Sequence, residues 1–319
     1  MRTGEESPSP FLGRLLRLQL QPGRRVIWLG AAWAALCGAV ASGRLTLSRQ
    51  DLLSLGLLLF LADPLLGAVW SALEAIRLPG EVHSSSAEAH LPPLPYTRPG
   101  SPGDGVFAHL NATVSWWRAD AWPQMGTALV GLMVASALAL AIGLVLGRWV
   151  ALLTTVALAS PFVAMALLGQ HPLSEPFTRA LPEIGLAWLL GYALFQDLSL
   201  PPNEATLGTS PQASALAWLG THGGILLLAG LYTITYYACL ILHERSHLVL
   251  GLALLNGAQL TVALLLVAVR QPILAGWVGL LLISQVLFQP LLRRQGARWY
   301  LERTQFFLMG SMLVAALGI

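Results

Sequence analysis

The residues best suited to chemistry stand in His243-Glu244-x-x-His247, inside the apolar run 225–269. On a continuous helix, two histidines four positions apart can ligate one Zn²⁺ while the glutamate polarises a bound water. A third protein ligand is also needed, and the candidates are Glu74, Glu302 and His171. The pattern therefore predicts, as one alternative, a zinc-dependent membrane hydrolase that uses His243, Glu244 and His247.

The same segment carries polar residues at helical spacing. At 100° per residue they fall within a stripe about 80° wide, which comprises Tyr232, Tyr236, Cys239, His243 and His247. A polar stripe on a membrane-spanning helix normally faces protein or a water-filled cavity. Tyr232 and Tyr236 are therefore candidate substrate-binding residues. An equally open interpretation is that the tyrosines hydrogen-bond neighbouring helices and the histidines lie at the membrane surface.

A second set of polar residues shares one face of the apolar segment 52–76. Its members are Asp63, Gly67, Trp70, Glu74 and Arg77. An ionisable residue at bilayer depth costs several kcal/mol unless it is paired or hydrated, so Asp63 and Glu74 are candidate catalytic carboxylates. Trp70 and Arg77 are candidate substrate contacts. Alternatively, Asp63 caps or hydrates the helix break at Pro64 and only shapes the packing.

The composition indicates that membrane helices position these residues. Of the 319 residues, 55% are hydrophobic and 10% are charged, whereas soluble domains carry about 25% charged residues. The net charge of +3 does not indicate a nucleic-acid partner, because the arginines flank apolar segments. Nine spans are expected, at about 26–42, 52–76, 124–147, 149–169, 181–196, 223–242, 248–269, 272–292 and 304–319.

The predicted organisation is one transmembrane helical domain, 26–319, after a cytoplasmic segment at 1–25. A cytoplasmic loop at 77–122 ends in a tryptophan-rich segment typical of the membrane interface. The fifth span is short and contains Pro182-Glu183. For the seventh span, Asn256-Gly257 offers an alternative turn, which would leave 244–256 lying on the membrane surface.

Arginine placement predicts the orientation. With the N-terminus inside, fourteen arginines fall in cytoplasmic segments and four in outside segments. We therefore expect a multi-pass protein of the cell (inner) membrane with a cytoplasmic N-terminus and an outside C-terminus. The 77–122 loop and His243-Glu244 would share the cytoplasmic face.

Nine spans with cytoplasmic loops after spans two and six resemble the UbiA superfamily of intramembrane prenyltransferases. The first of those loops contains YTRPG at 96–100, which looks like that family's Arg-Pro segment. The second is occupied by HERSHLVLGLALLNGAQL at 243–260. The tail looks like the family's basic loop and last span, RRQGARWYLERTQFFLMGSMLVAALGI.

The resemblance implies an all-α bundle of about nine helices around a cavity open to the cytoplasm. The implied substrate is a membrane lipid or polyprenyl diphosphate, and the implied reaction is prenyl or alkyl transfer with Mg²⁺ on carboxylates. Here the two acidic regions offer Glu74 and Glu244, which we expect within about 10 Å of each other, a separation at which the two charges still interact. Phosphate would be bound by Arg77, Arg98 and Arg245. A third alternative is a non-catalytic subunit that binds lipid, pigment or other membrane-complex subunits.

Overall fold

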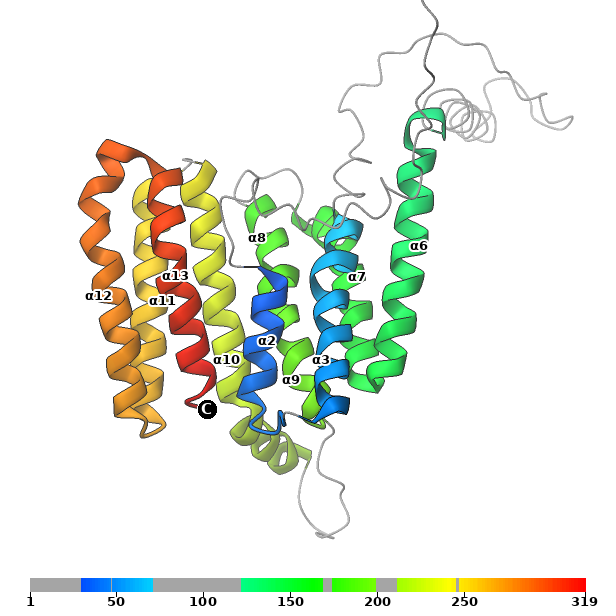
Figure 1. Ribbon diagram of the computed structural model, residues 1–319, viewed down its shortest axis with the longest axis horizontal. Helices are drawn as coiled ribbons and strands as arrows, with labels where there is room; N and C mark the ends of the chain where they lie inside the picture. Colours follow the sequence, from blue (N-terminus) through cyan, green and yellow to red (C-terminus); the bar gives the residue numbers. More distant parts are fainter. Residues whose placement is uncertain (1–29, 47, 71–121, 169–173, 199–210, 245–246) are drawn as a thin grey trace, which may run out of the picture. The chain divides into compact units, whose positions relative to one another are not determined.

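The computed structural model describes residues 30–46, 48–70, 122–168, 174–198, 211–244 and 247–319. Every regular element in these ranges is a helix, which confirms the predicted all-α class (Figure 1). The contacts divide the chain into two units. The smaller comprises Met1–Leu16 with Ala68–Ser136, and its described residues are helical. The larger, here the main unit, comprises Arg17–Gly67 with Ala137–Ile319.

The first helices begin and end at recognisable local signals. They are α2 (Ala31–Ala41), α3 (Arg49–Phe60), the π-helical turn η1 (Leu61–Leu65), α6 (Trp122–Leu146) and α7 (Arg148–Leu168). The hydroxyl of Ser48 accepts a 3.1 Å hydrogen bond from the backbone N–H of Asp51 and so caps α3. Gly147 separates α6 from α7 at a φ of 134°, a conformation that favours glycine.

The later helices form a succession of hairpins in the main unit. They are α8 (Ser174–Ala180), the π-helical turn η3 (Leu181–Leu186), α9 (Ala187–Phe195), α10 (Pro211–Glu244), α11 (Leu248–Ala268), α12 (Pro272–Gln295) and α13 (Ala297–Ala316). Along this succession α10 packs on α11, α11 on α12 and α12 on α13. Helix α13 returns to contact α10 and α2.

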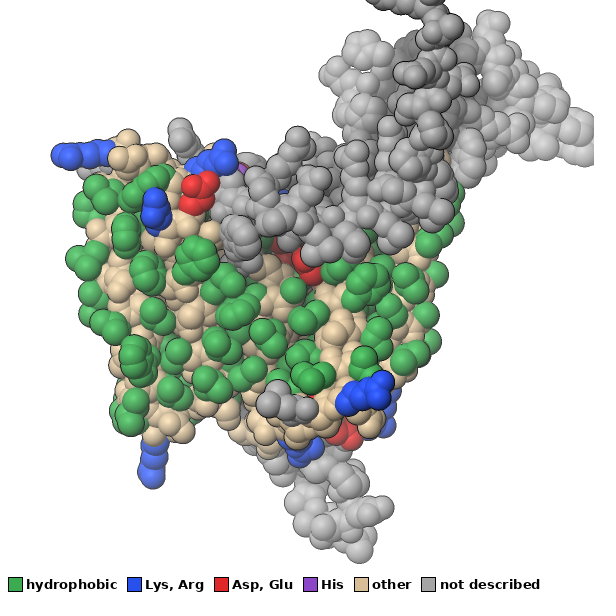
Figure 2. All heavy atoms as spheres, viewed as in Figure 1, with side chains coloured by type: hydrophobic (Ala, Val, Ile, Leu, Met, Phe, Trp, Pro, Cys, Tyr) green, Lys and Arg blue, Asp and Glu red, His purple; other side chains and the backbone are tan. Residues whose placement is uncertain are grey.

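Among the residues that the structure describes, five apolar helical segments are long enough to cross a membrane, which confirms that this is a helical membrane protein. They are Arg49–Trp70, Leu129–Leu146, Gly220–Glu244, Leu248–Ala268 and Pro272–Leu292. Over α12 and α13, Figure 2 shows hydrophobic side chains across the middle and arginine side chains at the two ends. That distribution is typical of a surface that faces lipid between two polar layers.

One predicted detail of the helices, the start of the seventh span, can be compared with the structure. Helix α11 runs without interruption from Leu248, so the alternative turn at Asn256-Gly257 is wrong. The Asn256 side chain instead accepts a 2.8 Å hydrogen bond from Nε2 of Gln289 on α12. Apolar periodicity over 248–269 favoured a helix. The Asn256–Gln289 hydrogen bond joins this helix to α12 and does not interrupt it.

The tightest crossing of the main unit joins α2 to α9. A methyl group added to Gly38 would lie 1.9 Å from the carbonyl oxygen of Trp188, and one added to Gly191 would lie 1.9 Å from that of Ala35. Only glycine permits this backbone approach, which is common between membrane helices. Helix α2 also contacts α3, α13 and both π-helical turns, so it lies at the centre of these elements.

Candidate functional site

Two carboxylates lie in interrupted stretches of helix. Asp63 precedes Pro64 in η1, and Glu183 follows Pro182 in η3. Proline removes a backbone N–H and crowds the preceding turn, and a π-helical turn is one way in which the chain accommodates it. Such turns are frequent at functional sites. Both turns pack against α2 in the main unit.

Both carboxylate oxygens of Glu183 are paired. Its Oε1 accepts a 2.9 Å hydrogen bond from Nε of Arg179, and its Oε2 accepts a 2.5 Å bond from the hydroxyl of Tyr236 on α10. The Glu183 side chain is 21% exposed and that of Arg179 is 48% exposed. Pairing both oxygens makes a carboxylate tolerable within an apolar helix. We call Arg179, Glu183 and Tyr236 the Glu183 site.

A layer of aromatic rings lies along α9 and α10 next to the Glu183 site. Trp188 stacks on Tyr232 with ring centroids 5.5 Å apart and an interplanar angle of 14°. Both residues are fully buried, and neither the Trp188 Nε1–H nor the Tyr232 hydroxyl has a hydrogen-bond partner among the residues that the structure describes. Between layer and site, a methyl group at Gly185 would lie 2.6 Å from the Thr233 hydroxyl, so η3 and α10 approach closely there.

A further aromatic contact places the Glu183 site toward the Glu244 end of α10. The ring of Phe177 on α8 meets that of Tyr237 edge-on, with centroids 5.8 Å apart. Because α8 and η3 both pack on the same stretch of α10, the Arg179 guanidinium is fixed beside Tyr236. The site therefore combines a cation, an anion and a hydroxyl at the edge of an aromatic interior.

The predicted polar stripe on α10 divides into a buried and an exposed part. Tyr232, Tyr236 and Cys239 are buried, with exposed fractions of 0%, 4% and 1%. His243 and His247 are exposed. The buried part faces protein, as a polar stripe in an apolar helix requires.

The residues predicted to bind zinc do not share one continuous helix among the described residues. Helix α10 ends at Glu244, and His247 has a φ of −147° and a ψ of 77° just before α11. Within the described ranges no group of three His, Cys, Asp or Glu residues could hold a metal ion. Of the suggested third ligands, Glu302 pairs with Arg298 at 3.0 Å, and Glu74 and His171 lie outside those ranges. The zinc site stays a prediction.

Of the other predicted site residues, the structure describes only some. Asp63 and Trp70 are half-buried. Glu74 lies outside the described residues, and the separation of Glu74 and Glu244 stays a prediction for that reason. The three predicted phosphate-binding arginines also lie outside them, namely Arg77, Arg98 and Arg245.

Sequence reasoning missed Glu183 and Arg179 as site residues. The signal was present, because an ionisable residue beside a proline in an apolar stretch marks a functional candidate. Pro182-Glu183 was noted only as a feature of the short fifth span. The Tyr236 partner lies 53 positions away, which no local pattern indicates.

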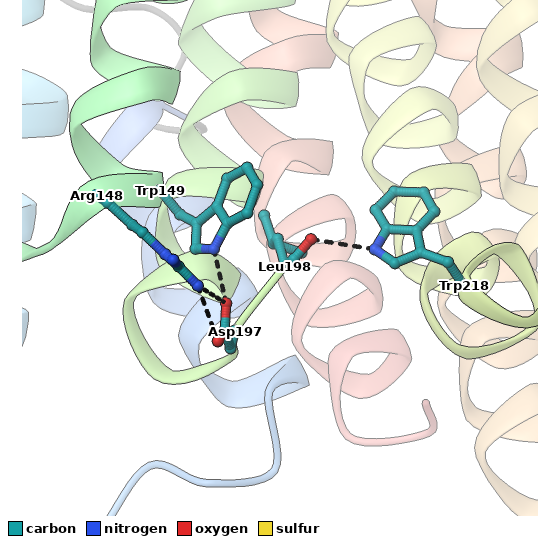
Figure 3. A network of polar contacts seen from close by, with 5 residues as sticks. All are labelled: Arg148, Trp149, Asp197, Leu198 and Trp218. Atoms are coloured by element: carbon teal, nitrogen blue, oxygen red, sulfur yellow. Dashed lines mark hydrogen bonds and ion pairs between the residues drawn. The ribbon is translucent and has the colours of Figure 1, made fainter. Parts of the chain in front are cut away.

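A separate polar network lies at the other end of these helices (Figure 3). Asp197 accepts hydrogen bonds of 3.1 and 3.2 Å from Arg148 and one of 2.7 Å from Nε1 of Trp149. Nearby, Nε1 of Trp218 donates to the backbone oxygen of Leu198 at 3.2 Å. The Arg148 and Asp197 side chains are 70% and 60% exposed, so their ion pair contributes little, about 0–1 kcal/mol. These hydrogen bonds join the start of α7 to the segment that follows α9, and that segment to α10.

The Glu183 site is thus the best-defined polar arrangement inside the described helices. Its assignment rests on its own geometry. Comparisons with protein-family models, with characterised proteins and with solved structures give no match to this chain.

Proposed function

We propose that this is a UbiA-like integral membrane protein that binds a long apolar lipid of the polyprenyl type. The observation that carries the proposal is the arginine of the Glu183 site beside the buried Trp188–Tyr232 layer. Arg179 would bind the phosphate of the lipid head, and the apolar chain would run along the aromatic layer. Arginine suits this role because its planar fork matches phosphate oxygens.

In this arrangement Glu183 is a positioning residue. It accepts from Nε of Arg179 and so orients the guanidinium, whose planar N–H donors suit phosphate oxygens. The Tyr236 hydroxyl holds the second carboxylate oxygen and so fixes the orientation of the pair. Arg77, Arg98 and Arg245 stay predicted phosphate-binding residues on the strength of the resemblance alone.

Binding is better supported than transfer chemistry. Magnesium is held by carboxylate oxygens that converge on one ion, as when two carboxylates stand three or four positions apart on a helix. None of the fifteen carboxylates in this sequence stands three or four positions from another. The environment of Glu183, which includes the Arg179 cation, does not fit a divalent ion. We therefore favour a lipid-binding protein, alone or as a subunit of a membrane complex.

The proposed topology has nine spans, a cytoplasmic N-terminus and an outside C-terminus in the cell membrane. Its support is that each predicted span contains a described helix and that Ile319 packs near Gly224, far along α10 from His243-Glu244. A reporter that is active only in the cytoplasm, fused after Ile319, is expected to be silent. An active reporter would contradict the odd number of spans.

Lipid binding is tested with radiolabelled geranylgeranyl diphosphate and the purified protein in detergent. Arg179→Gln should weaken saturable binding about tenfold or more, because a charge-assisted hydrogen bond contributes about 1.5–3 kcal/mol. The matched control is Arg298→Gln, which removes an arginine from an exposed pair of the same spacing and should leave binding unchanged. Absence of saturable binding to the wild type, or equal loss in both variants, would contradict the proposal.

A further inference from the structure

Polar side chains that do not belong to the Glu183 site lie inside the helices α11, α12 and α13. Gln259, Gln285 and Tyr300 have exposed fractions of 1%, 1% and 0%. Nε2 of each glutamine and the Tyr300 hydroxyl have no hydrogen-bond partner within the described part of the chain. A buried donor without an acceptor costs about 1–3 kcal/mol, so these three groups need an explanation.

The register of the hairpins brings these groups together. Gln289 on α12 donates to Asn256 on α11 at 2.8 Å, which fixes the antiparallel alignment of the two helices. Gln259 follows Asn256 by three positions and Gln285 precedes Gln289 by four, so they lie at one level, about one turn deeper. The Tyr300 hydroxyl on α13 lies beside the Gln285 and Gln289 side chains without hydrogen-bond geometry to either. We call these five residues the amide cluster.

Packing between helices accounts for only part of the amide cluster. Amide side chains often hydrogen-bond across membrane helices, and the Asn256–Gln289 bond is such a contact. That role requires satisfied groups, whereas the deeper level has three donors without acceptors. Aromatic rings lie beside it, since Phe288 is 6.0 Å from both Trp299 and Phe307 between ring centroids.

We propose that the amide cluster binds an uncharged, lipid-soluble ligand that carries carbonyl oxygens. A carbonyl oxygen accepts hydrogen bonds and brings no donor, so it complements the Gln259 and Gln285 amides and the Tyr300 hydroxyl. The cluster consists of neutral side chains, and a charged ligand there would lack a counter-charge. The ligand enters from the Asn256–Gln289 side, where the side chains are part-exposed, and opens the closed packing around the inner donors.

The test uses 2-tridecanone labelled with ¹³C at its carbonyl group, with the full-length protein in dodecyl maltoside, a detergent without carbonyl groups. Infrared difference spectra should reveal a saturable fraction of the probe whose carbonyl band is shifted to lower frequency by hydrogen bonding. Gln285→Leu and Tyr300→Phe should each reduce that fraction at least severalfold. Gln271→Leu, at an exposed position in the α11–α12 connection, is the matched control and should leave it unchanged.

Three results would overturn the proposal. The first is a wild-type spectrum without a saturable shifted band, and the second is a band that persists in Tyr300→Phe. Tyr300→Phe removes one hydroxyl and keeps the ring, so we expect this variant to fold. It therefore still tests ligand binding if Gln285→Leu fails to fold. Equal loss in Gln271→Leu would also overturn the proposal, because it would assign the band to the surface.

Discussion

Two arginine–glutamate pairs in this chain share a spacing and a hydrogen bond but lie in different surroundings. In both, Nε of the arginine donates to Oε1 of a glutamate four positions later, at 2.9 Å for Arg179–Glu183 and 3.0 Å for Arg298–Glu302. The glutamate side chain is 21% exposed in the first pair and 44% exposed in the second. Only the first carboxylate, among the described residues, also binds a side chain of another helix, the Tyr236 hydroxyl.

The difference in exposure and partners between the two glutamates arises from the backbone around them and not from the spacing of each arginine–glutamate pair. Between Arg179 and Glu183 the chain passes Pro182 and enters the π-helical turn η3, which packs against α10. Arg298 and Glu302 lie on the first turns of α13, a regular helix, and face outward. An exposed pair of this spacing contributes about 0.3–0.5 kcal/mol. A half-buried pair with a third partner is expected to fix the position of its groups, which is what a binding site requires.

The largest effect is expected from removing the inner carboxylate. Glu183→Ala removes the carboxylate to which both the Tyr236 hydroxyl and Arg179 donate, so the free energy of unfolding should fall by about 2–3 kcal/mol. Glu302→Ala should lower it by less than about 0.5 kcal/mol. Unfolding of both variants in a detergent titration measures the difference. Equal losses would show that the surroundings of the pair do not matter.

A smaller effect is expected from removing only the interhelical hydroxyl. Tyr236→Phe deletes the donor to Glu183 and should cost about 1–2 kcal/mol, since the bond has a charged acceptor. Tyr300→Phe is the matched control, because that buried hydroxyl has no hydrogen-bond partner in the described part of the chain. It should be neutral or slightly stabilising in the absence of ligand. A neutral Tyr236→Phe would remove the reason for treating the two pairs differently.

The comparison also separates what the sequence predicts from what it does not. Apolar periodicity predicted a helix within about 248–269, with its start left open, and the polar stripe predicted that Tyr232 and Tyr236 face protein or a cavity, because these features depend on neighbours within a few turns. The partner of Tyr236 depends on how α8 and η3 pack against α10. The two arginine–glutamate pairs look alike in the sequence, since burial is a property of the fold and not of the spacing. Sequence reasoning therefore named Tyr236 and missed Glu183.

The smallest expected effect concerns the outer pair and its response to salt. Glu302→Gln removes one charge from side chains that are 70% and 44% exposed, so the free energy of unfolding should change by less than about 0.5 kcal/mol. In about 1 M salt the Debye length is about 3 Å, and even that difference should disappear. Glu183→Gln should keep a measurable loss in the same salt, because its partners are shielded by α8 and α10 and salt screens them less. If salt abolishes the loss in both variants, the inner pair is as open to solvent as the outer one, and Arg179 has no pre-set orientation with which to bind a phosphate.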